Sequence, residues 1–269
     1  MNDTPQEHFV KQCIVYTVPG MDTVAVRRDE TYRVKDEGAF TMDVYYPSSA
    51  VAGKRYPAVL FVTGFSDAGA QRMFGRQFKE MGSYISWAKV VAASGMVAVT
   101  YTNEAPEADV HAVLQHLRDH AADLQIDEQR LAIWACSGHV PNALSVLLHA
   151  AGRLKCAVLC YGYLLDFDGS SVVADAAKQF GFVNPCAGQS VNDLPRNVPL
   201  FVARAGHDVM PGLNTALDHF VGRALTSDLP VTLVNYPGAP HAFDLFADAD
   251  ESRDIIRQIL TFMSSRLAT

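Results

Sequence analysis

The amino-acid sequence predicts an α/β fold in which a mostly parallel central sheet carries helices on both faces. Short apolar runs rich in β-branched residues recur along the chain, as expected of strands that are buried on both faces. Amphipathic segments of helical length lie between several of these runs, as in a parallel sheet with crossover helices. Of the 269 residues, 49% are hydrophobic. The chain can therefore bury a large core, and we expect one domain over residues 1–269.

Two antiparallel strands are expected before the parallel part of the sheet. Residues 12–18 and 39–46 alternate polar and apolar side chains, a pattern typical of half-buried strands, and Pro47 ends the second. These strands would extend one edge of the sheet.

Six buried strands follow, each a short apolar run that stops at a polar or turn-forming segment. They are expected at residues 58–62, 96–101, 131–135, 156–160, 200–204 and 231–235. Helices are expected at residues 83–94, 109–122, 143–151 and 251–267. The second opens with acidic residues, which suit the positive end of a helix, and the last has an apolar stripe with helical spacing.

Residues 162–198 interrupt this alternation. They contain several Asp, Gly and Pro residues and few strand signals, and they lie between two core strands. A long insertion at such a place is usually functional, so we expect a lid-like segment over the site. The alternative is a surface excursion with its own small core.

Charge and cysteine content limit the partners. The 22 basic and 29 acidic residues give a net charge of −7, which argues against a nucleic-acid or anionic-membrane partner. No run reaches the roughly 18 apolar residues of a membrane helix, and the polar residues 1–13 do not resemble a signal peptide. The five cysteines lack framework spacing; Cys156 and Cys160 are expected to be buried thiols in a strand. We therefore expect a cytoplasmic location.

A nucleophile is expected just beyond the strand at 131–135, because chemistry in open α/β sheets lies at the carboxyl ends of the strands. A short corner and a helix follow this strand, which is the context of a nucleophile elbow. Ser137 stands at the centre of that corner. Cys136 is the rival nucleophile, but centring the corner on it places Trp134 where a small residue is needed. A serine that only caps the helix is the other alternative.

The elbow departs from the consensus G-x-S-x-G at its last position, which is His139. Two readings stay open: His139 lines the pocket and contacts substrate, or it packs at the start of the helix. We favour the pocket wall.

A base and an acid are expected beyond two other strands. His241 follows the strand at 231–235 on a loop constrained by Pro and Gly, which suits a general base. Asp208 follows the strand at 200–204 and could orient that imidazole. Asp166 is a competing acid. The chain order Ser, Asp, His is the one expected of α/β-hydrolases.

An oxyanion hole needs two backbone N–H donors. Gly138 follows the nucleophile and supplies one candidate donor. Phe65, in the loop after the strand at 58–62, supplies the other. The alternative is that Gly64 and its neighbours form an ordinary turn. His116 and His120 lie four residues apart on a helix and could form half of a metal site, but no third ligand is in view, so no metal is expected.

The chain resembles α/β-hydrolases of the dienelactone-hydrolase-like group of esterases. The resemblance rests on DVYYP at 43–47, PAVLFVTGF at 57–65, IWACSGH at 133–139, VARAGHD at 202–208 and YPGAPHAFD at 236–244. It implies the α/β-hydrolase fold and neither cofactor nor metal. Dienelactone hydrolases proper use a Cys nucleophile, and Ser137 at that place favours ester hydrolysis over lactone opening.

The expected function is that of a serine carboxylesterase acting on small to medium esters through an acyl-enzyme. His139, Tyr161, Tyr163 and Phe182 are expected to line the pocket. The alternatives are a dienelactone or other lactone hydrolase, an amidase or peptidase, and a catalytically silent binding protein of the same fold. The expected partner is a small-molecule ester, and we expect neither a nucleic-acid nor a membrane partner. Whether the chain forms a homodimer is left open.

Overall fold

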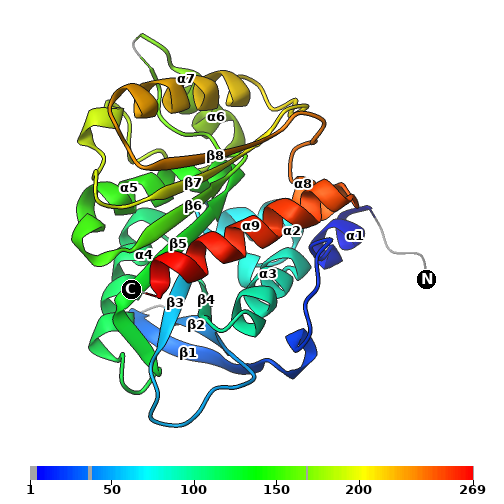
Figure 1. Ribbon diagram of the computed structural model, residues 1–269, viewed down its shortest axis with the longest axis vertical. Helices are drawn as coiled ribbons and strands as arrows, with labels where there is room; N and C mark the ends of the chain where they lie inside the picture. Colours follow the sequence, from blue (N-terminus) through cyan, green and yellow to red (C-terminus); the bar gives the residue numbers. More distant parts are fainter. Residues whose placement is uncertain (1–4, 36–37, 168, 269) are drawn as a thin grey trace.

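The sheet of the protein has eight strands. The computed structural model describes residues 5–35, 38–167 and 169–268. Its strands are β1 (Ala25–Lys35), β2 (Gly38–Tyr46), β3 (Tyr56–Phe61), β4 (Val97–Tyr101), β5 (Ile126–Cys136), β6 (Cys156–Cys160), β7 (Leu200–Ala205) and β8 (Val231–Tyr236). They lie in the order β1-β2-β4-β3-β5-β6-β7-β8 (Figure 1). The pairs β1–β2 and β2–β4 are antiparallel, and all other pairs are parallel.

Helices cover both faces of this sheet, which confirms the expected fold class. They are α1 (Pro5–Lys11), α2 (Asp67–Phe74), α3 (Gly82–Ala93), α4 (Pro106–Asp119), α5 (Val140–Ala150), α6 (Val172–Phe180), α7 (Leu213–Thr226), α8 (Phe243–Phe246) and α9 (Asp250–Leu267). The buried side chains of α4, α5 and α7 join one core, and those of α1, α3 and α9 join another (Figure 1).

The central strands feed both cores by strict alternation. Leu60 and Ile133 pack with the core of α4, α5 and α7, whereas Phe61 and Trp134 pack with the core of α3 and α9. Successive side chains of a strand point to opposite faces, so an unbroken apolar run is what two covered faces require. Each such side chain contributes about 1.5–3 kcal/mol on burial.

The prediction of a strand at 12–18 is wrong. This segment is irregular, and its backbone makes isolated bonds: the Ile14 N–H donates to Ser86 Oγ at 3.0 Å and the Val15 N–H to the Asp244 carbonyl at 2.8 Å. Its alternating apolar residues pack over α3 instead of pairing in a ladder. The edge strand is β1, where Tyr32 alone is buried and six of the eleven residues are charged, as is common for strands at an edge.

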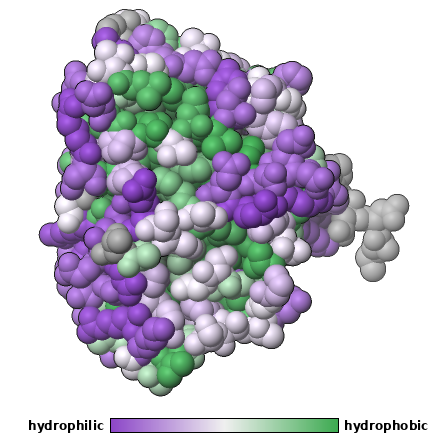
Figure 2. Space-filling model, in the orientation of Figure 1, coloured by the Kyte–Doolittle hydropathy of each residue, from purple (hydrophilic) through white to green (hydrophobic). Residues whose placement is uncertain are grey.

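The strand expected at 231–235 is present, but the prediction that it is buried is wrong. β8 forms the opposite edge of the sheet, and Thr232, Leu233 and Asn235 are exposed. Figure 2 shows a hydrophobic area near β8 and hydrophilic residues along the outer side of α9. The amphipathic stripe expected for 251–267 is present: α9 buries Ile255, Ile256 and their helical neighbours.

Residues 162–198 contain α6 and a 3₁₀ turn at Val191–Asp193 between longer irregular segments. The Val183 N–H donates to the Gly64 carbonyl at 2.8 Å, which ties the segment to the loop after β3. The segment therefore lies beside the predicted site. Its role as a lid stays a prediction.

Candidate active site

The corner after β5 has the backbone of an elbow. β5 ends at Cys136, a 3₁₀ turn spans Ser137–His139, and α5 begins at Val140. Ser137 has φ of 52°, in the left-handed region that non-glycine residues rarely adopt. Such a conformation costs about 1–3 kcal/mol and persists where the surrounding packing enforces it. The strained turn sets the Ser137 side chain clear of the sheet.

The structure brings together Ser137, His241 and Asp208. Ser137 Oγ lies 2.9 Å from His241 Nε2, and Asp208 Oδ2 lies 2.6 Å from His241 Nδ1. The Asp208 side chain is fully buried, and its other oxygen accepts the Met210 N–H at 2.9 Å. An acceptor carboxylate at Nδ1 favours the tautomer whose Nε2 lone pair faces the hydroxyl. The arrangement can take a proton from Ser137 Oγ.

The competing residues Asp166 and Cys136 take no part in this hydrogen-bonded chain. The Asp166 carboxylate accepts the N–H groups of Val173 and Ala174 at 2.8 and 3.1 Å, so it caps α6. Burial raises the pKa of the Cys136 thiol, which leaves little of the thiolate that a nucleophile needs. Neither side chain is hydrogen-bonded to His241 in the described part of the chain.

The loop that carries His241 is held by a buried carboxylate that sequence reasoning missed. Asp244 accepts the Tyr161 hydroxyl at 2.6 Å and the Trp87 indole N–H at 2.7 Å. Burial raises the pKa of Asp244. Tyr161 also sets its ring edge-on to His241, with centroids 5.1 Å apart. The backbone of Ala242, next to His241, has φ of 53°. The contacts of Asp244 and Tyr161 therefore hold the HAFD segment, and with it the His241 imidazole, in position.

The two predicted oxyanion donors lie on adjacent loops. Within the described residues the Phe65 N–H donates to no acceptor. Gly138 is the second residue of its 3₁₀ turn, where an N–H has no partner inside the helix. A Cβ on Gly138 would lie 3.0 Å from the Phe65 ring, so the two residues are in contact.

His139 fits at the elbow because the neighbouring loop supplies the space. A Cβ on Gly64 would lie 2.4 Å from the Gly138 carbonyl oxygen and 2.9 Å from His139 Cα. The last position of the elbow can therefore carry a side chain here, although the consensus has glycine. The backbones of the two loops come closest at Gly64, which has no side chain. The His139 side chain points toward Phe65, Phe78 and Tyr84.

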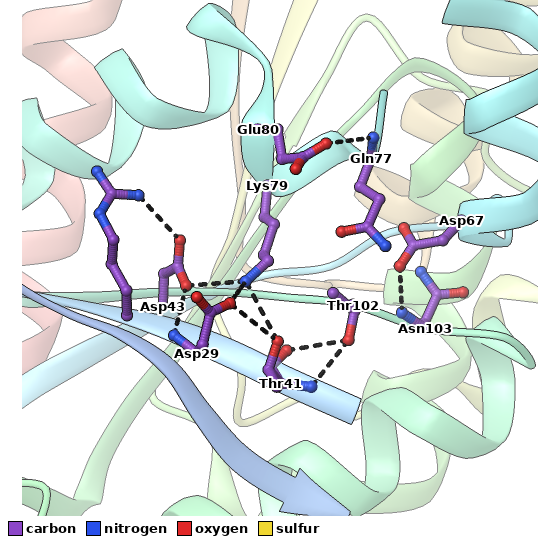
Figure 3. Close-up of polar contacts among 10 residues, drawn as sticks. Asp29, Thr41, Asp43, Asp67, Gln77, Lys79, Glu80, Thr102 and Asn103 are labelled. Carbon is purple, nitrogen blue, oxygen red and sulfur yellow. Dashed lines mark hydrogen bonds and ion pairs between the residues drawn. The ribbon is translucent and has the colours of Figure 1, made fainter. Parts of the chain in front are cut away.

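Asn103 and Asp67 hold the loop of Gly64 and Phe65 from another side. Asn103 Nδ2 donates to Thr63 Oγ1 at 2.9 Å and to the Phe65 carbonyl at 3.1 Å. Asp67 Oδ2 accepts the Asn103 N–H at 2.9 Å (Figure 3). Burial raises the pKa of Asp67 to about 6. These contacts fix the backbone that precedes α2.

An apolar cavity of about 290 Å³ opens at Ser137 and His241. All four residues predicted for the pocket, namely His139, Tyr161, Tyr163 and Phe182, line it. The larger share of its aromatic wall comes from residues that the sequence analysis did not assign to the pocket. These aromatic residues are Phe9, Phe74, Phe78, Tyr84, Trp87, Trp134 and Phe246.

Phe9 of the N-terminal helix lines one end of this cavity. Phe9 of α1 stacks on Phe74 of α2 and Phe246 of α8, with centroids 5.2 and 5.9 Å apart. Phe246 is half exposed, so this end reaches solvent. Residues 162–198 supply Tyr163, Phe180 and Phe182, so they form part of the pocket wall.

A second cavity, of about 480 Å³, lies beside Asp67 and Asn103 and is lined mainly by polar side chains (Figure 3). Lys79 fills part of it and donates to Asp29 at 2.6 Å and Asp43 at 3.0 Å. Its lining includes neither Ser137 nor His241. We place the candidate active site in the smaller cavity, because that one contains the nucleophile, the base and an apolar wall.

The two helical histidines lie away from this site. The rings of His116 and His120 stack on each other with centroids 4.0 Å apart. Within residues 5–35, 38–167 and 169–268, no group of three His, Cys, Asp or Glu side chains could hold a metal ion. In the same ranges, no helix is long and apolar enough to cross a bilayer.

Several solved structures share this fold. An alpha/beta hydrolase enzyme from the metagenome of Lake Arreo, Spain, has a TM-score of 0.69 and 20% identity over 93% of this chain and 87% of that chain. For a Pyrobaculum calidifontis esterase the TM-score is 0.65, with 20% identity over 90% and 85%. A bacterial heroin esterase gives 0.69, with 17% identity over 92% and 86%. The chain therefore has the α/β-hydrolase fold. Neither a protein-family model nor a curated protein sequence matches it.

Proposed function

We propose that the protein is a serine carboxylesterase that hydrolyses small to medium carboxylic esters through an acyl-enzyme. One observation carries the proposal: Ser137 Oγ, the His241 imidazole and the Asp208 carboxylate form a continuous hydrogen-bonded chain. Similarity to esterase structures supports it, since those proteins share the fold. Within such esterases we place the chain in the dienelactone-hydrolase-like group, on the five segments that resemble it.

In the proposed mechanism His241 Nε2 takes the hydroxyl proton as Ser137 Oγ attacks the ester carbonyl carbon. Asp208 stabilises the imidazolium that forms. The N–H groups of Phe65 and Gly138 donate to the oxygen that becomes negative, and each such donor contributes about 10²–10³ in rate. The alcohol leaves with the proton from His241. Water, deprotonated by His241, then attacks the acyl-enzyme and releases the acid.

The apolar cavity supports an acyl or aryl group of limited size. Its volume of about 290 Å³ is at the lower end for small-molecule sites. Aromatic rings form much of its wall. Esters with short acyl or benzoyl groups should therefore turn over faster than long-chain lipids.

Turnover of p-nitrophenyl butyrate tests the proposal with two matched variants. Ser137→Ala should lose the burst of p-nitrophenol and nearly all steady-state turnover, because the attacking oxygen is gone. Cys136→Ala should keep a Ser137-dependent burst. Full turnover by Ser137→Ala together with its loss in Cys136→Ala would instead identify the thiol as the nucleophile.

Three outcomes would redirect the assignment within the fold. Faster hydrolysis of cyclic than of matched linear esters would indicate a lactone hydrolase. Anilide rates equal to ester rates would indicate an amidase or peptidase. No turnover and no labelling by a fluorophosphonate would indicate a binding protein.

A further inference from the structure

His139, two residues after the nucleophile, accepts a backbone hydrogen bond from the facing loop. The Gly64 N–H donates to His139 Nδ1 at 2.8 Å, and the His139 side chain is only 5% exposed. This bond joins the corner after β5 to the loop after β3. It is a side-chain acceptor in a place where a consensus elbow would have a glycine without a side chain.

Three aromatic rings fix the orientation of the imidazole. The rings of Phe65, Phe78 and Tyr84 all meet it edge-on, with centroids 5.1, 4.7 and 6.0 Å away. Burial lowers the pKa of His139 to about 3, so the ring is neutral at working pH. A neutral ring that accepts at Nδ1 carries its hydrogen on Nε2.

The hydrogen bond settles which amide of the loop is available. The Gly64 N–H is engaged by His139, whereas the next amide, Phe65 N–H, donates to no acceptor among the described residues. The loop is also held through its carbonyls, because Asn142 Nδ2 donates to the Thr63 carbonyl at 2.8 Å and Asn103 Nδ2 to that of Phe65. The bond from the Gly64 N–H to His139 differs from these contacts, because it joins the loop directly to the elbow.

We propose that His139 is a positioning residue that holds the loop at 63–65 against the elbow, so that the Phe65 N–H faces the oxygen that develops negative charge. The inference rests on the proposed esterase function. His139 acts through Gly64 and the backbone, without contacting the reacting atoms. A displaced donor loses most of its value in the transition state while substrate binding is little changed.

The test compares variants that keep or remove the acceptor. His139→Asn places an oxygen near the position of Nδ1, whereas His139→Phe keeps a ring among the aromatic neighbours but has no acceptor. For p-nitrophenyl butyrate, His139→Phe should lower kcat by about 10–100-fold with KM changed less than about threefold. It should weaken inhibition by a trifluoromethyl ketone, which forms an oxyanion on Ser137, by a similar factor. His139→Asn should recover most of both losses.

A kcat for His139→Phe within about twofold of wild type, or a loss that His139→Asn does not recover, would overturn the inference. If His139→Phe does not fold, His139→Gln replaces it, because its longer side chain moves the acceptor away from Gly64; an unchanged kcat in that variant likewise overturns the inference. Ser137→Ala separates the two proposals. If Ser137→Ala is inactive and His139→Phe fully active, the esterase assignment stands and this inference alone fails. If Ser137→Ala is active, the proposed esterase mechanism is itself wrong, and the inference about His139 that rests on it fails with it.

Discussion

Gly64 and His139 lie 75 residues apart in the sequence, yet the N–H of the first donates to Nδ1 of the second at 2.8 Å inside the site. The contact explains how an elbow without its last glycine can form. Close approach of backbones needs one residue without a side chain, and Gly64 on the facing loop meets that need. The side chain of His139 is then free to pack among aromatic rings and bond the loop.

Replacing the acid of the candidate triad should remove catalysis while leaving the fold intact. In Asp208→Asn the amide can donate to His241 Nδ1, which stabilises the wrong tautomer of the imidazole. We expect kcat to fall by roughly 10³–10⁴-fold with little change in KM. Steady-state kinetics with p-nitrophenyl butyrate measure the effect.

Asp166→Asn is the matched control, because Asp166 caps α6 and does not touch His241. Its kcat should stay within about twofold of wild type, at a stability cost of about 1 kcal/mol or less. Equal losses in both variants would contradict the assignment of Asp208.

Asp67 should make stability fall as pH rises through the weakly acidic range. Its pKa is about 6 in the folded chain, raised by burial, against about 3.9 when unfolded. Between these values the folded state binds more protons than the unfolded state. Its contribution is therefore complete below about pH 4 and is lost as pH rises through 6, by about 3 kcal/mol in all.

Asp67→Asn removes this titration and keeps an oxygen to accept the Asn103 N–H. The free energy of unfolding of the variant should exceed that of wild type at pH 7, and the difference should vanish near pH 4. Urea unfolding at several pH values gives the comparison. A difference that does not change with pH would show that Asp67 ionises normally.

The hydrogen bond from Trp87 to Asp244 should contribute to stability. Trp87→Phe removes a donor from a buried carboxylate, so we expect a loss of about 1–3 kcal/mol beyond the change in packing. Trp134→Phe is the control, because within the described residues its indole N–H donates to no carboxylate and has only the Cys160 thiol beside it. Thermal unfolding of both variants measures the difference. Equal shifts in Tm would mean that the bond to Asp244 contributes nothing.

The stack of Phe9 on Phe74 and Phe246 should limit the length of the acyl chain. Phe9→Ala enlarges that end of the cavity, and kcat/KM for an octanoate over a butyrate ester should rise by roughly tenfold. Phe40→Ala, on β2 and outside this cavity, should leave the ratio unchanged. An unchanged ratio in Phe9→Ala would place the acyl group elsewhere.

The buried parallel strands could be predicted because both of their faces need apolar residues. Five of the six apolar runs, from 58–62 to 200–204, are strands of the buried sheet. The edges could not be predicted in the same way. β1 is rich in charged residues because it is exposed to solvent. Polar and apolar residues alternate along 12–18 because this segment packs over α3 and does not pair in the sheet. The four predicted helices correspond to α3, α4, α5 and α9, whereas α1, α2, α6, α7 and α8 have no counterpart among the predicted helices.

The triad geometry could be anticipated because each of its members follows a strand, and the carboxyl ends of parallel strands meet at one edge. The pocket wall could not. Phe9, Phe74 and Phe246 come from three segments whose proximity depends on how α1, α2 and α8 pack. The position of the loop that carries His241 depends on the hydrogen bonds from Trp87 and Tyr161 to Asp244, and no local sequence pattern encodes these contacts.

Peptide mapping after reaction with a fluorophosphonate tests the central assignment most directly. The reagent phosphonylates a serine only when a base and an oxyanion site activate it. We predict one adduct per chain, on Ser137, absent from Ser137→Ala and strongly slowed in Asp208→Asn. A chain that takes up no reagent, or that carries the adduct on Cys136 or another residue, would contradict the account.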